Sequence, residues 1–397
     1  MRIFAVLFVI LAVEGAARVI KTIHDDVVAG EDDWYVYASD VGWRPRPGGA
    51  HITARVRRRF DERGFLVEDT AKLARPKARP RVVGIGDSTM YGYDVEGRDT
   101  YMAGLGERFP GVDFINLAVP AYTACNGSCR LVSDGLPLDP SLILASFSFN
   151  DRRYVLRPDE MDSPERFASL ARRQALEAVT GRIYVLRGLM FGLGKAGLVS
   201  RGPGGLEDYA RSGAVDLATL KPRVDPDGYR QYLTRIVQTA RGRDIPLVFI
   251  MTGDNPDWML PIREALARGK AGDAKAEVGL LQQAVQARNA LTPLARLELA
   301  RVLEAAGNAE AARDVRTDPY PFNSVLGGYP IFRDDQYQQI LRDVAARNAV
   351  PLVDARLLDR PDVFMDFCHF NAEGHGLVAD LVARALVEKR LIPRPRQ

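Results

Sequence analysis

The sequence predicts an α/β fold in which helices cover both faces of a parallel sheet. Five short, mostly apolar runs recur along the chain, and helical patterns such as 101–109 and 335–348 lie between them. Strands that alternate with helices form parallel βαβ units, and a strand buried on both faces has a continuous apolar run. The five runs occupy 81–86, 112–117, 142–147, 245–251 and 350–353. We therefore expect one parallel sheet, with a functional site beyond the carboxyl ends of its strands.

The composition is that of a globular protein with its own hydrophobic core. The chain has 397 residues, of which 47% are hydrophobic and 26% charged, and its formal net charge is +3. This length suffices for one large domain with additions. The basic residues are scattered, and the densest run, at 57–59, is typical of a solvated strand end. No nucleic-acid partner is expected.

The N-terminus carries an apolar run that indicates membrane targeting. Residues 3–13 are all apolar, Arg2 precedes them, and small residues follow at 15–17. The run reaches the length of a membrane span only if Glu14 and Arg18, four residues apart, pair on a helix. We expect a signal anchor or transmembrane helix over 1–24, with a cleaved signal peptide or a buried helix as alternatives. The bulk of the chain would then be membrane-anchored and periplasmic or extracellular.

Residues 25–80 have the pattern of an irregular N-terminal segment with short strands. The stretches 34–37 and 51–56 have strand character, and the glycines at 48–49 mark a turn between them. Residues 71–80 contain prolines and basic residues, as a linker would.

Two insertions lengthen the α/β pattern. Residues 152–240 exceed an ordinary crossover, and the apolar stretch 183–199 within them reads as a helix packed on the sheet or one that touches membrane or substrate. Residues 262–316 are helical in pattern, and 295–313 resemble half of a tetratricopeptide repeat. One such unit predicts an inserted helical hairpin, which offers a surface for protein docking or caps the sheet.

The cysteines and histidines do not have the spacing of a metal site. There are three cysteines and four histidines, and no phosphate loop or cofactor motif accompanies them. Cys125 and Cys129 are four residues apart, and a disulfide between them would strain a helix, so two free thiols are favoured and a bridge is left open. The sequence predicts neither a metal nor a cofactor.

Two short motifs carry the residues of a serine nucleophile and its base. Gly86, Asp87 and Ser88 directly follow the first strand, so the serine lies at the carboxyl edge of the sheet. Near the end of the chain, Asp366 precedes His369 by three residues, a spacing that lets a carboxylate orient an imidazole. A second histidine, His375, precedes the last helix and is interpreted as structural.

Two further features follow the second and third strands. Residues 116–118 (Asn-Leu-Ala) follow the second, and residues 148–151 (Ser-Phe-Asn-Asp) follow the third. An Asn-Asp pair alone is usually a turn. Because the carboxyl ends of parallel strands meet at one edge, these groups are expected to lie near Ser88.

Together these four pieces resemble the four sequence blocks of the SGNH/GDSL hydrolase superfamily. The resemblance covers about 81–151 and 350–390 and implies a three-layer α/β/α sheet of flavodoxin-like type, divided into 81–261 and 317–397 by the inserted hairpin. It implies Ser88 as nucleophile, His369 as base and Asp366 as the residue that orients the base. The implied oxyanion hole consists of the backbone N–H groups of Ser88 and Ala118 and the side-chain amide of Asn150.

The sequence departs from the superfamily pattern at three positions. Alanines replace the glycines of the second block at Ala118 and Ala121, and Ser148 replaces the glycine of the third block. A backbone N–H survives a change from glycine to alanine unless the site needs a positive φ.

The resemblance implies a serine esterase that cleaves a carboxylic ester through an acyl-Ser88 intermediate. By analogy with the superfamily, an acylated carbohydrate of the bacterial envelope is one substrate class. An O-acyltransferase that modifies an envelope glycan is an alternative, and a catalytically degenerate binding protein that docks partners on 262–316 is another.

Overall fold

The computed structural model describes residues 34–74, 79–155, 161–180, 221–257, 260–287, 292–317 and 334–392. The anchor expected over 1–24 and the apolar stretch 183–199 lie outside these ranges. Among the residues described, no helix combines the length and the apolar character that crossing a bilayer requires.

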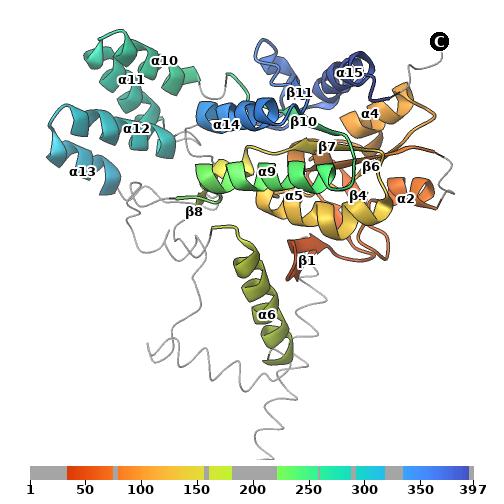
Figure 1. The fold of residues 1–397 in the computed structure, drawn as a ribbon. Helices are drawn as coiled ribbons and strands as arrows, with labels where there is room; N and C mark the ends of the chain where they lie inside the picture. Colours follow the sequence, from red (N-terminus) through yellow and green to blue (C-terminus); the bar gives the residue numbers. More distant parts are fainter. Residues whose placement is uncertain are drawn as a thin grey trace, which may run out of the picture.

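A five-stranded parallel sheet forms the centre of the molecule (Figure 1). Its spatial order is β11-β10-β7-β5-β6. In the chain β5 is followed by β6 and then by β7, and in the sheet these two strands lie on opposite sides of β5. This is the flavodoxin-like order, with a topological switch point between β5 and β7. The strands are β5 (Arg81–Gly86), β6 (Asp113–Asn116), β7 (Leu142–Ser146), β10 (Leu247–Met251) and β11 (Leu352–Asp354). Four of the five predicted runs contain one of these strands, β11 extends one residue beyond the fifth run, and the predicted fold class is confirmed.

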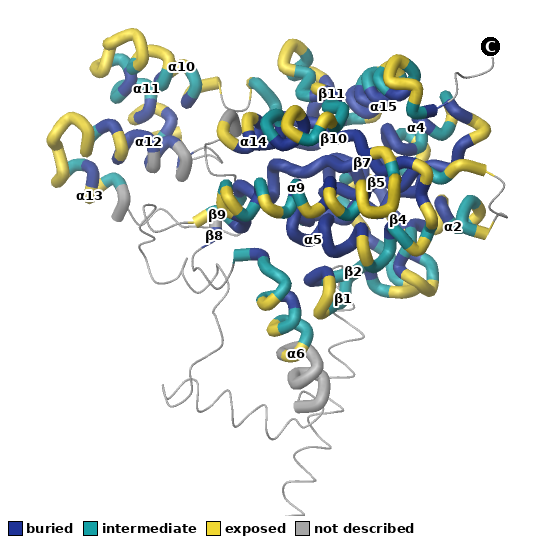
Figure 2. The backbone as a smooth tube through the Cα atoms, in the orientation of Figure 1, coloured by how far each residue is buried: buried dark blue, intermediate teal, exposed yellow. Residues whose placement is uncertain are grey.

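Alternate side chains of each strand face opposite helical layers. Val83 and Ile85 of β5 pack with one layer, whereas Val82 packs with the other. The first layer consists of α5 (Ala124–Arg130), α9 (Pro226–Arg241) and α14 (Asp334–Arg347), and the second of α3 (Ser88–Tyr91), α4 (Tyr101–Arg108) and α15 (Ala372–Glu388). Figure 2 shows the strands as the buried centre between layers that are exposed on their outer sides. The result is a three-layer sandwich.

The helix α5 lies unusually close to the sheet. A Cβ atom built on Gly127 would come within 2.0 Å of the Phe147 ring, so only glycine allows this approach. The helix thereby begins beside the carboxyl ends of the strands.

The N-terminal segment forms two small antiparallel pairs against the sandwich. They are β1 (Tyr35–Ala38) with β2 (Gly42–Pro45), and β3 (Ala50–Ile52) with β4 (Arg57–Arg59). The strand predicted over 51–56 is too long, because Thr53 N–H bonds to Val56 O at 2.9 Å and closes a turn. Helix α2 (Val67–Leu73) follows. Three further elements lie between β7 and α9 in the chain, namely β8 (Tyr154–Val155), α6 (Pro164–Thr180) and β9 (Lys221–Pro222).

The insertion contains two helical hairpins, where the sequence predicted one. Its helices are α10 (Leu260–Lys270), α11 (Ala274–Gln286), α12 (Thr292–Ala305) and α13 (Ala309–Thr317), and they form a lobe beside the sheet (Figure 1). The turns of the two hairpins repeat after 35 residues, from Gly272 to Gly307, both at positive φ. The next residue in each, Asp273 or Asn308, accepts the N–H three positions later. The resemblance to a known repeat covers 295–313 alone and therefore predicts only the second of these hairpins.

Candidate active site

Ser88 lies on a sharp turn at the end of the central strand. Strand β5 ends at Gly86, and the buried Asp87 side chain accepts Thr89 N–H at 2.9 Å to cap α3. Ser88 is therefore the first residue of a helix that Gly92 ends after one turn, at φ 82°. A side chain on Gly92 would clash with Thr100, so glycine is required there. This turn holds the Ser88 hydroxyl at the switch point of the sheet.

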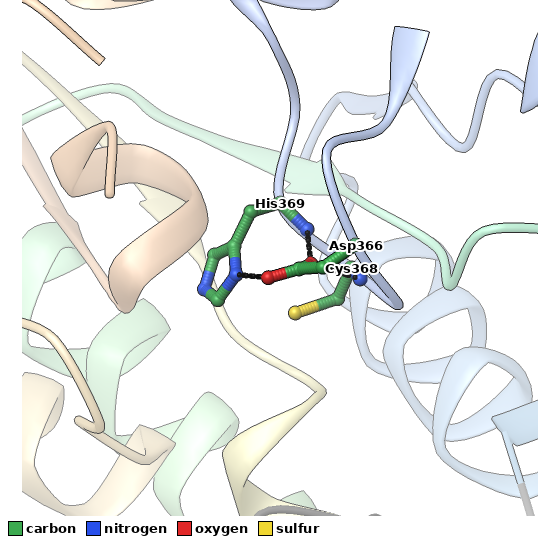
Figure 3. Close-up of side chains that lie close together, drawn as sticks. All are labelled: Asp366, Cys368 and His369. Carbon is green, nitrogen blue, oxygen red and sulfur yellow. Dashed lines mark hydrogen bonds and ion pairs between the residues drawn. The ribbon is translucent and has the colours of Figure 1, made fainter. Parts of the chain in front are cut away.

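The structure brings together the three residues that the sequence predicts as nucleophile, base and acid. The Ser88 Oγ atom lies 2.8 Å from His369 Nε2, although the two residues are 281 positions apart. On the other side of the ring, His369 Nδ1 lies 2.7 Å from Asp366 Oδ2. Figure 3 shows Asp366 turned back toward the backbone of its own loop, where its Oδ1 atom accepts the N–H of His369 at 2.8 Å.

The ionisation state of Asp366 determines which group donates in each of these hydrogen bonds. Burial opposes ionisation of Asp366, but the hydrogen bond and charge of His369 and two backbone N–H groups together hold its pKa below the ordinary value. An ionised Asp366 can only accept, so His369 Nδ1 carries the proton that it shares with Asp366. His369 Nε2 is then free to accept the proton of the Ser88 hydroxyl.

Asn150 presents an unused donor at the same edge of the sheet. It begins the turn after β7, is 3% exposed, and its Nδ2 group has no hydrogen-bond partner among the residues that the structure describes. A buried amide N–H without an acceptor is costly unless a ligand supplies one. Its Oδ1 atom accepts from the Arg153 guanidinium at 3.4 Å, which leaves Nδ2 as the free end.

The predicted role of Ala118 is wrong. Its N–H donates to Asn116 Oδ1 at 3.0 Å, so it is not available to a developing oxyanion. Three residues later, Ala121 adopts φ 65°, and its N–H, like that of Ser88, donates to no group in the described part of the chain. The sequence showed an alanine at both glycine positions but not which of them needed the left-handed backbone.

Aromatic rings surround the imidazole. Tyr93 stacks on His369 with ring centroids 4.6 Å apart and planes at 28°. Phe367 lies at 5.9 Å on a steeper angle and stacks in turn on Phe149 at 5.1 Å. The imidazole that contacts the Ser88 hydroxyl therefore packs against Tyr93 and lies near Phe367.

A buried ion pair braces the loop that carries the acid and the base. Arg152 donates two hydrogen bonds to Asp254, at 2.7 and 3.1 Å, and both side chains are almost fully buried. The neighbouring Asn255 donates its N–H to Phe367 O at 2.8 Å and its side-chain amide to Asp366 O at 3.1 Å. No sequence pattern predicts this contact, because its members come from three separate loops.

The remaining histidine and the cysteines have structural positions. His375 is fully buried, its Nδ1 accepts Tyr101 N–H at 3.3 Å, and burial, followed by the charges of His369 and Arg58, lowers its pKa to about 3. The prediction of free thiols is confirmed for Cys125 and Cys129, and Cys368 is also free.

One group of side chains has the composition of a metal site. Ligand atoms of Asp366, Cys368 and His369 lie within 4.8 Å of one another (Figure 3). Burial raises the pKa of the Cys368 thiol well above its usual value, and a protonated thiol is a poor ligand. Asp366 and His369 already bond to each other, so this arrangement favours proton transfer over metal binding.

Comparisons with known proteins give distant likenesses only. No family model and no curated protein matches the sequence. Among solved structures, the lipase/acylhydrolase from Enterococcus faecalis is 14% identical, with 80% of this chain and 99% of that one covered at a TM-score of 0.38. A GDSL-like lipase from Bacteroides thetaiotaomicron VPI-5482 is 12% identical, with 81% and 95% covered at 0.37. The psychrotrophic esterase EstA from a Pseudoalteromonas species is 9% identical, with 78% and 98% covered at 0.35. Likenesses of this degree carry no weight for function, which is inferred from the Ser88 site itself.

Proposed function

We propose that this chain is a carboxylic ester hydrolase of the SGNH/GDSL superfamily, with Ser88 as its nucleophile. One observation carries the proposal: an unbroken line of hydrogen bonds joins Asp366, His369 and Ser88 at 2.7 and 2.8 Å. A nucleophile, a base in reach of it and a carboxylate that orients the base are the parts that acyl transfer to serine needs.

The reaction follows from these positions. The Ser88 Oγ atom attacks the ester carbonyl while its proton moves to His369 Nε2, and Asp366 stabilises the imidazolium that forms. The oxyanion accepts from Asn150 Nδ2 and from the backbone N–H groups of Ser88 and Ala121. Each such donor typically contributes about 2.7–4 kcal/mol to the lowering of the barrier. His369 then protonates the leaving alcohol, and water cleaves the acyl-Ser88 ester by the same steps in reverse order.

The substrate that we propose is an ester whose acyl or alcohol part packs on aromatic walls. Phe367 lies with its ring centroid 5.9 Å from that of the imidazole that contacts Ser88, and Phe149 stacks on Phe367 at 5.1 Å. Apolar ring faces suit a short acyl group or the C–H face of a sugar, which agrees with the acylated carbohydrate that the sequence resemblance implies.

The test is ester cleavage by the full-length chain. Wild type should release 4-nitrophenol from 4-nitrophenyl acetate, and Ser88→Ala should lower the rate by a factor on the order of 10⁴–10⁶. Ser141→Ala is the matched control, since Ser141 is exposed and precedes β7 at the other end of the sheet. Equal activity in wild type and Ser88→Ala, with both proteins folded, would exclude Ser88 chemistry. Acetyl transfer to an added sugar without free acetate would favour the acyltransferase alternative.

A location at the cell envelope is a separate proposal, supported by the apolar run at 3–13 alone. Full-length chain made in cells should remain with membranes after an alkaline carbonate wash. A chain with Leu7 and Val9 both changed to Arg should be released. Equal release of the two would contradict a membrane anchor.

A further inference from the structure

We infer that Tyr93 is a positioning residue for His369, and that the N-terminal segment 51–58 (the clamp) holds Tyr93 in place. The inference rests on the proposed function, because it assigns a role in making the Ser88–His369 pair reactive. It adds to the site a residue outside the triad and a part of the chain outside the α/β sandwich.

The contact between the two rings is the first observation. His369 makes its hydrogen bonds to Asp366 and Ser88 through its two ring nitrogens. These bonds do little to prevent the imidazole from rotating about the line that joins the two nitrogens. Tyr93 lies against one ring face, with centroids 4.6 Å apart and planes at 28°. An aromatic face also attracts a cation, so this contact strengthens when the imidazole takes the Ser88 proton.

Tyr93 belongs to the turn that carries the nucleophile. Its N–H donates to Ser88 O at 3.0 Å, directly after Gly92 has turned the chain at positive φ. The nucleophile and the ring that supports its base are thus fixed relative to each other by one backbone hydrogen bond. A shift of this turn would move both the hydroxyl and the ring face.

The residue after Tyr93 is held in a strained conformation. Asp94 has φ 59°, in the left-handed region of the backbone. This region costs energy for every residue except glycine, although Asn and Asp adopt it more often than other residues do. Its Oδ1 atom accepts the Thr53 hydroxyl at 2.6 Å and Arg55 N–H at 2.9 Å, and its Oδ2 atom lies 3.5 Å from the Arg55 guanidinium. Such a conformation persists only where the surroundings maintain it, and here the clamp does so.

The clamp also contacts Tyr91, at the start of the same turn. The buried Arg58 donates to Tyr91 O at 3.1 Å, and its guanidinium lies 4.8 Å from the centre of the Tyr91 ring. His51 Nδ1 lies 3.3 Å from the Tyr91 hydroxyl. The residues that lie on either side of Tyr93 in this turn, Tyr91 and Asp94, are therefore both held by hydrogen bonds from the clamp.

The first experiment measures the reactivity of Ser88 without a substrate assumption. A fluorophosphonate labels an activated serine: Ser88 Oγ bonds to phosphorus, fluoride leaves, and the hydroxyl proton goes to His369. We expect Tyr93→Leu to lower the labelling rate, read by mass spectrometry, by about tenfold, and Tyr93→Phe to restore it. Tyr37→Leu, on β1, is the control for loss of an aromatic ring elsewhere. Tyr93→Leu should likewise lower kcat for 4-nitrophenyl acetate with little change in KM, whereas Tyr93→Phe and Tyr37→Leu should leave kcat near that of wild type.

The second experiment separates the effect of the clamp's hydrogen bonds to Asp94 from the effect of backbone strain at Asp94. Asp94→Asn keeps an acceptor at Oδ1 and tolerates positive φ, whereas Asp94→Gly relieves the strain and removes the acceptor. The Asn variant should label at about the wild-type rate and the Gly variant several-fold more slowly, even though its backbone is relaxed. Wild-type labelling by Tyr93→Leu would overturn the role of Tyr93, and wild-type labelling by Asp94→Gly would overturn that of the clamp. No labelling of wild-type Ser88 would instead refute the proposed function.

Discussion

Replacement of Asp254 by asparagine removes the negative charge that faces a buried guanidinium beside the active site. Arg152 and Asp254 are bonded through two hydrogen bonds, and their side chains are 2% and 6% exposed. Asparagine is nearly isosteric with aspartate, so the change deletes charge with little change of volume. The Arg152 guanidinium then stays buried, and water cannot replace the lost partner.

The expected cost is large for a single substitution. Removal of one member of a buried ion pair typically costs about 3–5 kcal/mol of unfolding free energy. Native proteins have about 5–15 kcal/mol in all, so this variant loses a substantial share. The loop of Asp254 also holds Asp366 and Phe367 through Asn255. We therefore expect kcat to fall more than KM changes, because the acid and base lose their brace.

Urea denaturation followed by circular dichroism measures the loss, and the chain provides a matched control. Arg356 donates to both carboxylate oxygens of Asp354, at 2.8 and 2.6 Å, but there the side chains are 23% and 48% exposed. Solvent screens such a pair, and Asp354→Asn should cost less than about 1 kcal/mol. Similar losses in the two variants would show that burial does not set the energetics of the Arg152 pair, and the reasoning would fail.

Three further predictions concern the oxyanion donors and the buried histidines. Asn150→Ala should lower kcat by about 10²–10³ and leave the urea midpoint near that of wild type; an unchanged kcat would remove Nδ2 from the oxyanion hole. Ala121→Gly should raise the unfolding free energy by roughly 0.5–1 kcal/mol, since it relieves φ 65°, whereas Ala118→Gly should lower it; the opposite order would contradict the backbone assignment. Burial lowers the pKa of His51 to about 4 and that of His375 to about 3, so both stay neutral in the folded state while the unfolded chain gains protons below about pH 6.5. Stability should thus be complete above that pH and fall as the pH is lowered toward 4, by about 2 kcal/mol for each histidine at about pH 5; urea titrations of wild type and His51→Gln at two pH values measure this slope, which the variant should reduce.

The sheet and the triad could be predicted from the sequence because both are encoded locally. Each strand lies in a short, mostly apolar run, and Ser88, Asn150 and His369 lie within a few residues of a strand or helix boundary. Once the strands are parallel, their carboxyl ends share one edge, which brings residues 281 positions apart into contact.

The features that the sequence did not predict depend on side-chain contacts between loops. We assign the backbone donor to Ala121 and not to Ala118 because the Asn116 side chain accepts the Ala118 N–H and because Ala121 has a left-handed φ. Neither feature can be read from the spacing of residues in the sequence. Arg152, Asp254 and Asn255 meet only in three dimensions. The first hairpin of the insertion differs from these contacts, since the 35-residue spacing from Gly272 to Gly307 is a local feature of the sequence.

The serial packing of α10 to α13 has a consequence for how this protein can change in length. Consecutive helices of the lobe pack on one another, and the turns of the two hairpins are spaced by 35 residues, from Gly272 to Gly307. Duplication or deletion of a whole unit would extend or shorten the lobe and leave the β10–α14 junction with the sandwich in register. Gains and losses of a few residues would instead break the helical phase. Natural length variants of this architecture should therefore differ in steps of about 35 residues, with the α/β sandwich unaltered.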